Sequence, residues 1–167
     1  MEYNGKKALV CGMARSGIAA AKLLNRLGAR VTLQDMKKRE EISADVLALE
    51  GEGIVLYTGA NPDEIACAQD LIVLSPGIPC DLPFIAAAEN AGIEVISEVE
   101  LAYRLTPCPI TAITGTNGKT TTTYLIKSIL EAQGRKTGII GTIQNCIGDK
   151  VLHADRTTPE SLELQEL

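Results

Sequence analysis

Short apolar runs alternate with helical segments along the first hundred residues, and this alternation limits the possible folds more than any other feature of the sequence. The apolar runs, which we expect to be buried strands, are residues 8–11, 30–35, 54–57, 71–74 and 93–96. The helical patterns are residues 18–27, 43–50, 84–90 and 98–105. This order predicts an α/β fold, Rossmann-like, in which helices cover both faces of a parallel sheet.

A boundary is predicted at residues 106–109, which read Thr-Pro-Cys-Pro, because two prolines end a helix and stiffen a connection. We expect one domain at residues 1–106 and a second at residues 107–167. The second domain is predicted as α/β, and its expected elements are a strand at 110–114, a helix at 120–133, a strand at 138–142, a turn at 148–149 and a helix from 157. A parallel α/β domain needs more strands than these, so we expect this central domain to be incomplete.

Composition excludes several classes of protein. The 167 residues are 46% hydrophobic and 22% charged, which is ordinary for a globular protein. A net charge of -5 argues against a nucleic-acid partner. No apolar stretch approaches a membrane span, so we expect no membrane partner. Five cysteines without a CxxC pair argue against a disulfide framework or a zinc site and indicate a cytoplasmic protein.

The run Gly-Thr-Asn-Gly-Lys-Thr-Thr at residues 115–121 lies between the predicted strand 110–114 and the predicted helix 120–133. A helix N-terminus attracts anions through its unpaired N–H groups. The two glycines let the backbone curl around a phosphate. Lys119 supplies positive charge for the β- and γ-phosphates, and Thr120 can place a hydroxyl on Mg²⁺.

The match to the Walker A pattern covers only the second half of that motif, because Ile113 stands where the pattern has its first glycine. The alternative interpretation is a glycine-rich turn that holds a lysine by chance. The strand before and the helix after favour a nucleotide phosphate.

A second glycine turn, Gly-Met-Ala-Arg-Ser-Gly at residues 12–17, also follows a strand and opens a helix. It is similar to the dinucleotide fingerprint G-x-G-x-x-G, and Asp35 stands near the expected acidic position. Ala14 replaces the glycine that lets the backbone approach a pyrophosphate. Three interpretations stay open: a nicotinamide dinucleotide site, a purely structural turn, and a site for another nucleotide such as a uridine diphosphate.

Together the two turns resemble one family. The run at residues 115–121 resembles the ATP loop of the Mur ligases, the ATP-dependent amide-forming enzymes of peptidoglycan precursor synthesis, and of the related folylpolyglutamate synthases. The stretches "VCGMARSGIAAAKLL", "LIVLSPGIP" and "SEVELAYRL" resemble the N-terminal domain of the D-glutamate-adding members, which binds the UDP part of a sugar nucleotide.

This resemblance implies a UDP-sugar site made of Arg15, Ser16, Asp35, Met36, Ser75, Pro76 and Gly77. Without the resemblance, the Ser75-Pro76-Gly77 run favours a plain turn at the end of a strand. Asp35 likewise has a simpler interpretation as a residue that caps the loop after its strand.

The last part of the chain, "GIIGTIQNCIGDKVLHADRTTPESLELQ", instead resembles the members that add diaminopimelate or lysine in the next step. In those members the Thr-Thr-Pro-Glu-Ser run binds the muramoyl-peptide, and the matching positions here are Thr157 and Thr158. The Asn-Ile-Gly motif of the D-glutamate-adding members is missing. The sequence therefore combines features of two neighbouring ligases.

The resemblance implies a function in which ATP activates the carboxylate of a UDP-N-acetylmuramoyl-peptide for attack by an amino acid. ATP-binding residues would be Gly115, Thr116, Asn117, Gly118, Lys119, Thr120 and Thr121, with Lys119 also catalytic and Thr120 at the Mg²⁺. The family's metal-binding glutamate, histidine and modified lysine and its C-terminal domain find no counterpart here. We therefore expect this chain to be inactive alone, and His153 to be incidental. The alternatives are a non-catalytic module that binds nucleotide or UDP-sugar, and a nicotinamide-dependent oxidoreductase.

Overall fold

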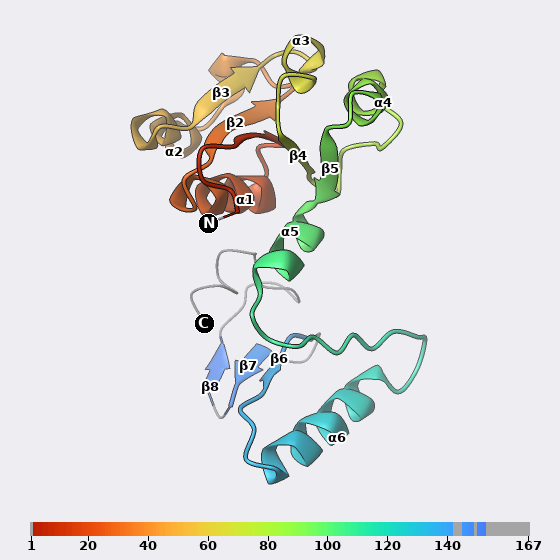
Figure 1. The fold of residues 1–167 in the computed structure, drawn as a ribbon. Helices are drawn as coiled ribbons and strands as arrows, with labels where there is room; N and C mark the ends of the chain where they lie inside the picture. Colours follow the sequence, from red (N-terminus) through yellow and green to blue (C-terminus); the bar gives the residue numbers. More distant parts are fainter. Residues whose placement is uncertain (1, 142–144, 149, 153–167) are drawn as a thin grey trace. The chain divides into compact units, whose positions relative to one another are not determined.

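The structure is a computed structural model that describes residues 2–141, 145–148 and 150–152 (Figure 1). The chain divides into two compact units, Met1–Thr106 and Pro107–Leu167.

The first unit contains a five-stranded parallel sheet in the order β3-β2-β1-β4-β5 (Figure 1). Its strands are β1 (Lys7–Cys11), β2 (Arg30–Asp35), β3 (Val55–Thr58), β4 (Leu71–Leu74) and β5 (Glu94–Ser97). The predicted parallel α/β fold is confirmed. Strand order reverses at β1, since β2 pairs on one side of it and β4 on the other. In sheets of this kind ligands bind beyond the carboxyl ends of the strands at such a reversal.

Helices connect the strands of this sheet. They are α1 (Arg15–Arg26), α2 (Ala44–Leu47), α3 (Asp63–Ala66), α4 (Pro83–Asn90) and α5 (Glu98–Leu105), with 3₁₀ turns at Arg39–Glu41 and Ala48–Glu52. Helix α1 begins three residues before the predicted start at residue 18. The predicted helix over 43–50 is instead divided between α2 and a 3₁₀ turn, and α3 was not predicted.

Alternate residues of the central strands pack on opposite faces of the sheet. Val10 and Val73 face one core, which α1 and α5 cover with Leu24 and Leu101 among others. Leu9, Cys11, Ile72 and Leu74 face the other core, where they pack with α3 and α4. A strand buried on both faces reads as a continuous apolar run, which explains why β1 and β4 were recognisable in the sequence.

The second unit contains the helix α6 (Lys119–Ala132) and three short strands (Figure 1). The strands are β6 (Gly138–Ile139), β7 (Asn145–Ile147) and β8 (Lys150–Leu152), and they pair antiparallel in the order β6-β7-β8. The prediction of a parallel arrangement here was wrong for these strands. Strands joined by a tight turn, as β7 and β8 are near Gly148, can pair only antiparallel.

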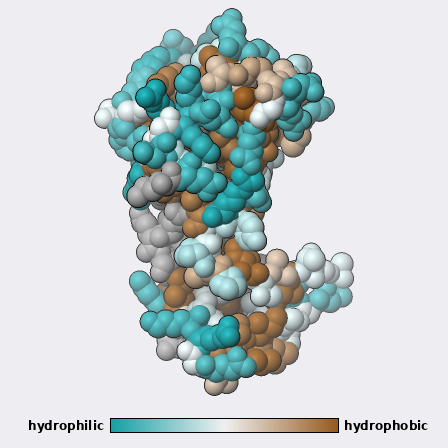
Figure 2. Space-filling model, in the orientation of Figure 1, coloured by the Kyte–Doolittle hydropathy of each residue, from teal (hydrophilic) through white to brown (hydrophobic). Residues whose placement is uncertain are grey.

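The prediction of a strand at residues 110–114 was also wrong, because these residues form no strand. A strand requires a neighbour that pairs with its backbone groups, and within the described residues none pairs with this segment. The predicted strand at 138–142 is shorter, with residue 142 outside the described residues. Ile110, Leu125 and Ile129 are exposed in this unit, and Figure 2 shows apolar surface on it. Across the described residues, no helix combines the length and apolar character that a membrane span requires.

Candidate functional site

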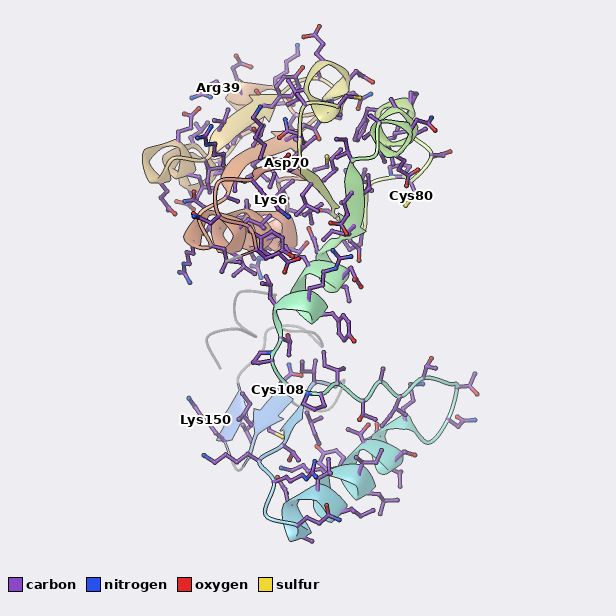
Figure 3. The ribbon with its side chains drawn as sticks, viewed as in Figure 1. Lys6, Arg39, Asp70, Cys80, Cys108 and Lys150 are labelled. Carbon is purple, nitrogen blue, oxygen red and sulfur yellow. The ribbon has the colours of Figure 1, made fainter. Side chains whose placement is uncertain are left out.

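The candidate residues of the first unit gather at the carboxyl edge of its sheet. The sheet is parallel, so the ends of β1, β2, β4 and β5 meet at the same edge. Gly12 follows β1, Asp35 ends β2, Ser75 follows β4 and Glu98 follows β5. At the opposite edge the Asp70 carboxylate has a structural contact, since it accepts a hydrogen bond from the Lys7 N–H at 2.8 Å. Asp70 is labelled in Figure 3.

The turn between β1 and α1 leaves the start of α1 open to a ligand. Gly12 has φ +109°, a conformation that favours glycine, and its N–H donates to the Gln34 carbonyl at 2.7 Å. Ala14 is the N-cap with φ -80°, which any residue adopts, so the alanine causes no backbone strain. The first bond within the helix joins the Ile18 N–H to the Ala14 carbonyl. The N–H groups of Arg15, Ser16 and Gly17 therefore lie at the N-terminus of α1. The first turn of this helix holds no acidic residue that would repel an anion.

Four of the predicted UDP-sugar residues offer accessible groups at this edge. Arg15 and Ser16 are the first two residues of α1, with Arg15 exposed and Ser16 half-buried. Met36, directly after β2, is 58% exposed. Gly77 is exposed, and a Cβ built there would meet nothing within 4 Å. A cation, a hydroxyl and an apolar side chain are thus available around the helix N-terminus.

Asp35 is held by backbone groups. One carboxylate oxygen accepts from the Met13 N–H at 2.9 Å and the other from the Lys37 N–H at 3.0 Å. The second bond is the loop cap that the simpler interpretation of Asp35 predicted. The first bond fixes the glycine turn relative to β2. Each oxygen keeps acceptor capacity for a ligand hydroxyl.

Ser75 is buried, and Pro76 beside it is exposed. The Ser75 N–H donates to the Cys11 carbonyl at 3.1 Å, and the Ser75 carbonyl accepts from the Ile78 N–H at 2.9 Å, which closes a tight turn. Its hydroxyl donates to the Glu98 carboxylate. The Ser75 side chain is therefore directed into the protein. Burial raises the pKa of the neighbouring Cys11 thiol to about 12, so this cysteine is no nucleophile.

Glu98 was not identified from the sequence as a site residue. It is the first residue of α5 and is 5% exposed at the same edge as the predicted residues. The signal that could have found it is the Ser97-Glu98 pair at the end of β5, where an N-cap serine is followed by a carboxylate at the first position of a helix.

The glycine-lysine loop of the second unit has the backbone that a phosphate cradle requires. Gly115 has φ +130° and Gly118 has φ +77°, and a Cβ at either would meet nothing within 4 Å. Gly118 is the N-cap of α6, and the first bond within the helix joins the Thr122 N–H to the Gly118 carbonyl at 2.9 Å. The N–H groups of Lys119, Thr120 and Thr121 therefore lie at the N-terminus of this 14-residue helix. The first turn of α6 holds no acidic residue.

Lys119 lies over this loop. Its ammonium donates to the Gly115 carbonyl and, at 3.4 Å, to the Thr116 carbonyl. The predicted loop residues Thr116, Asn117, Thr120 and Thr121 are exposed. Open glycine backbone, a helix N-terminus, a lysine and a hydroxyl fit the phosphates of ATP and an accompanying Mg²⁺. Thr157 and Thr158 lie outside the described residues, as do His153 and the predicted helix from 157. Within the described residues no group of three His, Cys, Asp or Glu side chains could hold a metal ion by itself.

Two family descriptions match the chain. The Mur ligase MurD-like N-terminal domain matches residues 6–97, and the Mur ligase middle domain matches residues 113–167.

Several curated relatives share one name. The UDP-N-acetylmuramoylalanine–D-glutamate ligase of Lactococcus lactis is 49% identical over 143 residues, which are 85% of this chain and 32% of the relative. The enzyme of the same name from Geotalea daltonii is 42% identical over 164 residues, 98% of this chain and 36% of the relative. Similarity to D-glutamate ligases thus extends over nearly the whole chain, including the part that resembles the next ligase. The chain spans about a third of the length of these relatives.

Among solved structures, a murein peptide ligase from Psychrobacter arcticus is similar with a TM-score of 0.53 and 24% identity. The match covers 81% of this chain and 28% of that one. At this identity the likeness shows a shared fold.

Proposed function

Because the chain belongs to the Mur ligase family, we propose that it provides the UDP-sugar-binding and ATP-phosphate-binding parts of a D-glutamate-adding amide ligase of peptidoglycan synthesis. The observation that carries the proposal is the presence of two open glycine turns in one chain. Each leads into the N-terminus of a long helix without acidic residues in its first turn. Relatives named as D-glutamate ligases favour this member of the family over the diaminopimelate- or lysine-adding one.

Residues 1–106 form the domain that binds the UDP part of UDP-N-acetylmuramoyl-L-alanine in this proposal. The N-terminus of α1 and the Arg15 guanidinium attract the diphosphate. Asp35 offers acceptors for ribose or base donors while it holds the glycine turn. Met36 provides apolar surface beside the sheet edge, and the turn from Ser75 to Gly77 forms the wall after β4.

Residues 107–167 form the start of the ATP-binding domain. The N–H groups at the start of α6 and the Lys119 ammonium bind the β- and γ-phosphates, and Lys119 stabilises the charge that develops during phosphoryl transfer. The Thr120 hydroxyl is the group of this loop suited to Mg²⁺. ATP supplies the phosphoryl group that activates the alanine carboxylate, so that the amine of D-glutamate can displace phosphate. We assign Thr157 and Thr158 to the muramoyl-peptide, and the protein to the cytoplasm.

A non-catalytic binding module is the second candidate, because the helix N-termini that begin with Arg15 and Lys119 are suited to holding phosphates without further chemistry. It is distinguished by tight binding of both ligands without ADP formation in a protein that also contains the other ligase domains.

Thermal unfolding with single ligands tests the proposal. UDP-N-acetylmuramoyl-L-alanine, its alanyl-D-glutamate derivative and MgATP are added separately. A ligand at ~100 times its Kd stabilises the folded state by about 2.7 kcal/mol. We expect stabilisation by the alanine form and by MgATP, and loss of the MgATP effect alone in Lys119→Met. Preference for the alanyl-glutamate form would move the chain to the next ligase, and no response to any ligand would refute the proposal.

A further inference from the structure

A buried carboxylate lies at the ligand edge of the first unit, and the proposed ligand contacts do not include it. Glu98 is 5% exposed and begins α5 directly after β5. Its carboxylate accepts the hydroxyl hydrogen of Ser75, which follows β4 and is 6% exposed. A buried carboxylate loses its hydration, and an apolar side chain would avoid that loss. A negative charge near an anion-binding helix end also opposes the binding of a diphosphate. A carboxylate at this position therefore calls for a specific explanation.

The Ser75 hydroxyl packs directly beneath the glycine turn. A Cβ on Gly12 would lie 2.6 Å from the Ser75 Oγ, and a Cβ on Gly17 would lie 3.0 Å from it. Both glycines are buried. Contact this close is available only because neither residue has a side chain. The hydroxyl thus occupies the space between the end of β1 and the first turn of α1.

The orientation of this hydroxyl is determined by Glu98. A serine hydroxyl has one hydrogen, and the hydrogen bond to Glu98 uses it. The Ser75 Oγ is then held on the side of α5 while it contacts the glycine turn. The same residue accepts the Ile78 N–H and donates its N–H to Cys11. One side chain therefore connects the N-terminus of α1 with the turn after β4, which are two walls of the proposed UDP site.

We propose that Glu98 is a positioning residue for UDP-sugar binding: through the Ser75 hydroxyl it fixes the spacing between the α1 N-terminus and the turn at Ser75–Ile78. This inference rests on the proposed function of residues 1–106. Glu98 acts through its hydrogen-bond acceptor and not through its charge, and it does not touch the ligand.

Calorimetric titration with UDP, well below the unfolding temperature, tests the proposal in the wild type and in four variants. Glu98→Gln keeps an acceptor for Ser75 and removes the charge, so it should bind UDP at least as tightly as the wild type. Glu98→Ala and Ser75→Ala should each weaken binding at least roughly fivefold, because the buried hydrogen bond that orients the Ser75 hydroxyl is lost. The double variant Ser75→Ala/Glu98→Ala should bind no more weakly than either single variant, because the two residues act as one unit.

Two controls separate positioning from general damage. Glu100→Ala removes another carboxylate of α5, one that pairs with Arg104, and should leave UDP affinity unchanged. MgATP affinity should be the same in all variants.

Three results would overturn the inference. Glu98→Ala could unfold at lower temperature yet bind UDP like the wild type, which would make the role purely structural. Equal loss in Glu98→Gln and Glu98→Ala would indicate a direct contact by the carboxylate. Additive losses in the double variant would separate the two residues. If the wild type does not bind UDP, the proposed function fails as well, and this outcome is distinct from the other three.

Discussion

Gly17 provides the sharpest test of how the glycine turn is built. It lies in the first turn of α1, and a Cβ there would stand 2.0 Å from the Gly12 carbonyl oxygen. Ordinary contact begins at 3.4 Å, so Gly17→Ala must move the helix and the turn apart by about 1.4 Å, the difference of the two distances. The obstacle is backbone, which cannot rotate away as a side chain would.

The expected loss of stability follows from two opposing effects. Overpacking of this kind costs up to ~3 kcal/mol, and alanine in place of glycine in a helix recovers about 1 kcal/mol. We expect a net loss of about 2 kcal/mol. For a unit of this size that lowers the melting temperature by roughly 8–16 °C.

Urea and thermal unfolding, followed by circular dichroism, measure this loss. Gly51→Ala is the matched control, because Gly51 lies in a 3₁₀ turn where a Cβ would meet nothing within 4 Å. We expect it to change stability by less than ~0.5 kcal/mol. A Gly17→Ala protein that is as stable as the wild type, or more stable, would refute the packing described for the turn.

Three further predictions concern other parts of the chain. Gly118→Ala should lower the stability of the second unit by ~1–2 kcal/mol and weaken MgATP binding, because the φ of +77° at this position strains any residue with a Cβ. Thermal unfolding measures the loss of stability and calorimetry the loss of affinity. Unchanged values of both would contradict this prediction. A thiol reagent should modify the exposed Cys67, Cys80 and Cys108 in the native protein and reach the buried Cys11 and Cys146 only in denaturant. Cys80 and Cys108 are labelled in Figure 3. Hydrogen bonds from Lys127 and Thr137 lower the pKa of the Glu131 carboxyl in the folded protein. The ionised carboxylate therefore stabilises the fold above pH about 4.3, the pKa of glutamate in an unfolded chain, and this stabilisation is lost as the pH falls through the lower pKa of the folded state. The free energy of unfolding of Glu131→Gln should accordingly depend less on pH below about 4.3 than that of the wild type. An identical pH dependence would count against the hydrogen bonds of Glu131 with Lys127 and Thr137.

The sheet of the first unit could be predicted because its central strands are short, continuous apolar runs in the sequence. Residues 71–74 are apolar at every position, and this pattern is typical of a short strand covered on both faces. The start of α1 was placed too late because Arg15, Ser16 and Gly17 read as a turn. The structure places them in the helix, where Gly17 is accepted because it packs against Gly12.

The second unit was less predictable. Residues 110–114 have the composition of a strand, but pairing is a property of the neighbours and not of the segment itself. The glycines of the predicted phosphate loop could be read from the sequence because the positive φ of Gly115 and Gly118 is a local requirement of the backbone. Glu98 was missed for the opposite reason, since its partner Ser75 is 23 residues away and the contact exists only in the folded sheet.

Calorimetric binding of UDP-N-acetylmuramoyl-L-alanine, repeated in the presence of UDP, NADH or MgATP, measures directly whether residues 1–106 bind a UDP-sugar. We expect saturable binding that UDP displaces and that neither NADH nor MgATP displaces. Saturable NADH binding that the UDP-sugar cannot displace would contradict it and would make the turn at residues 12–17 a dinucleotide site.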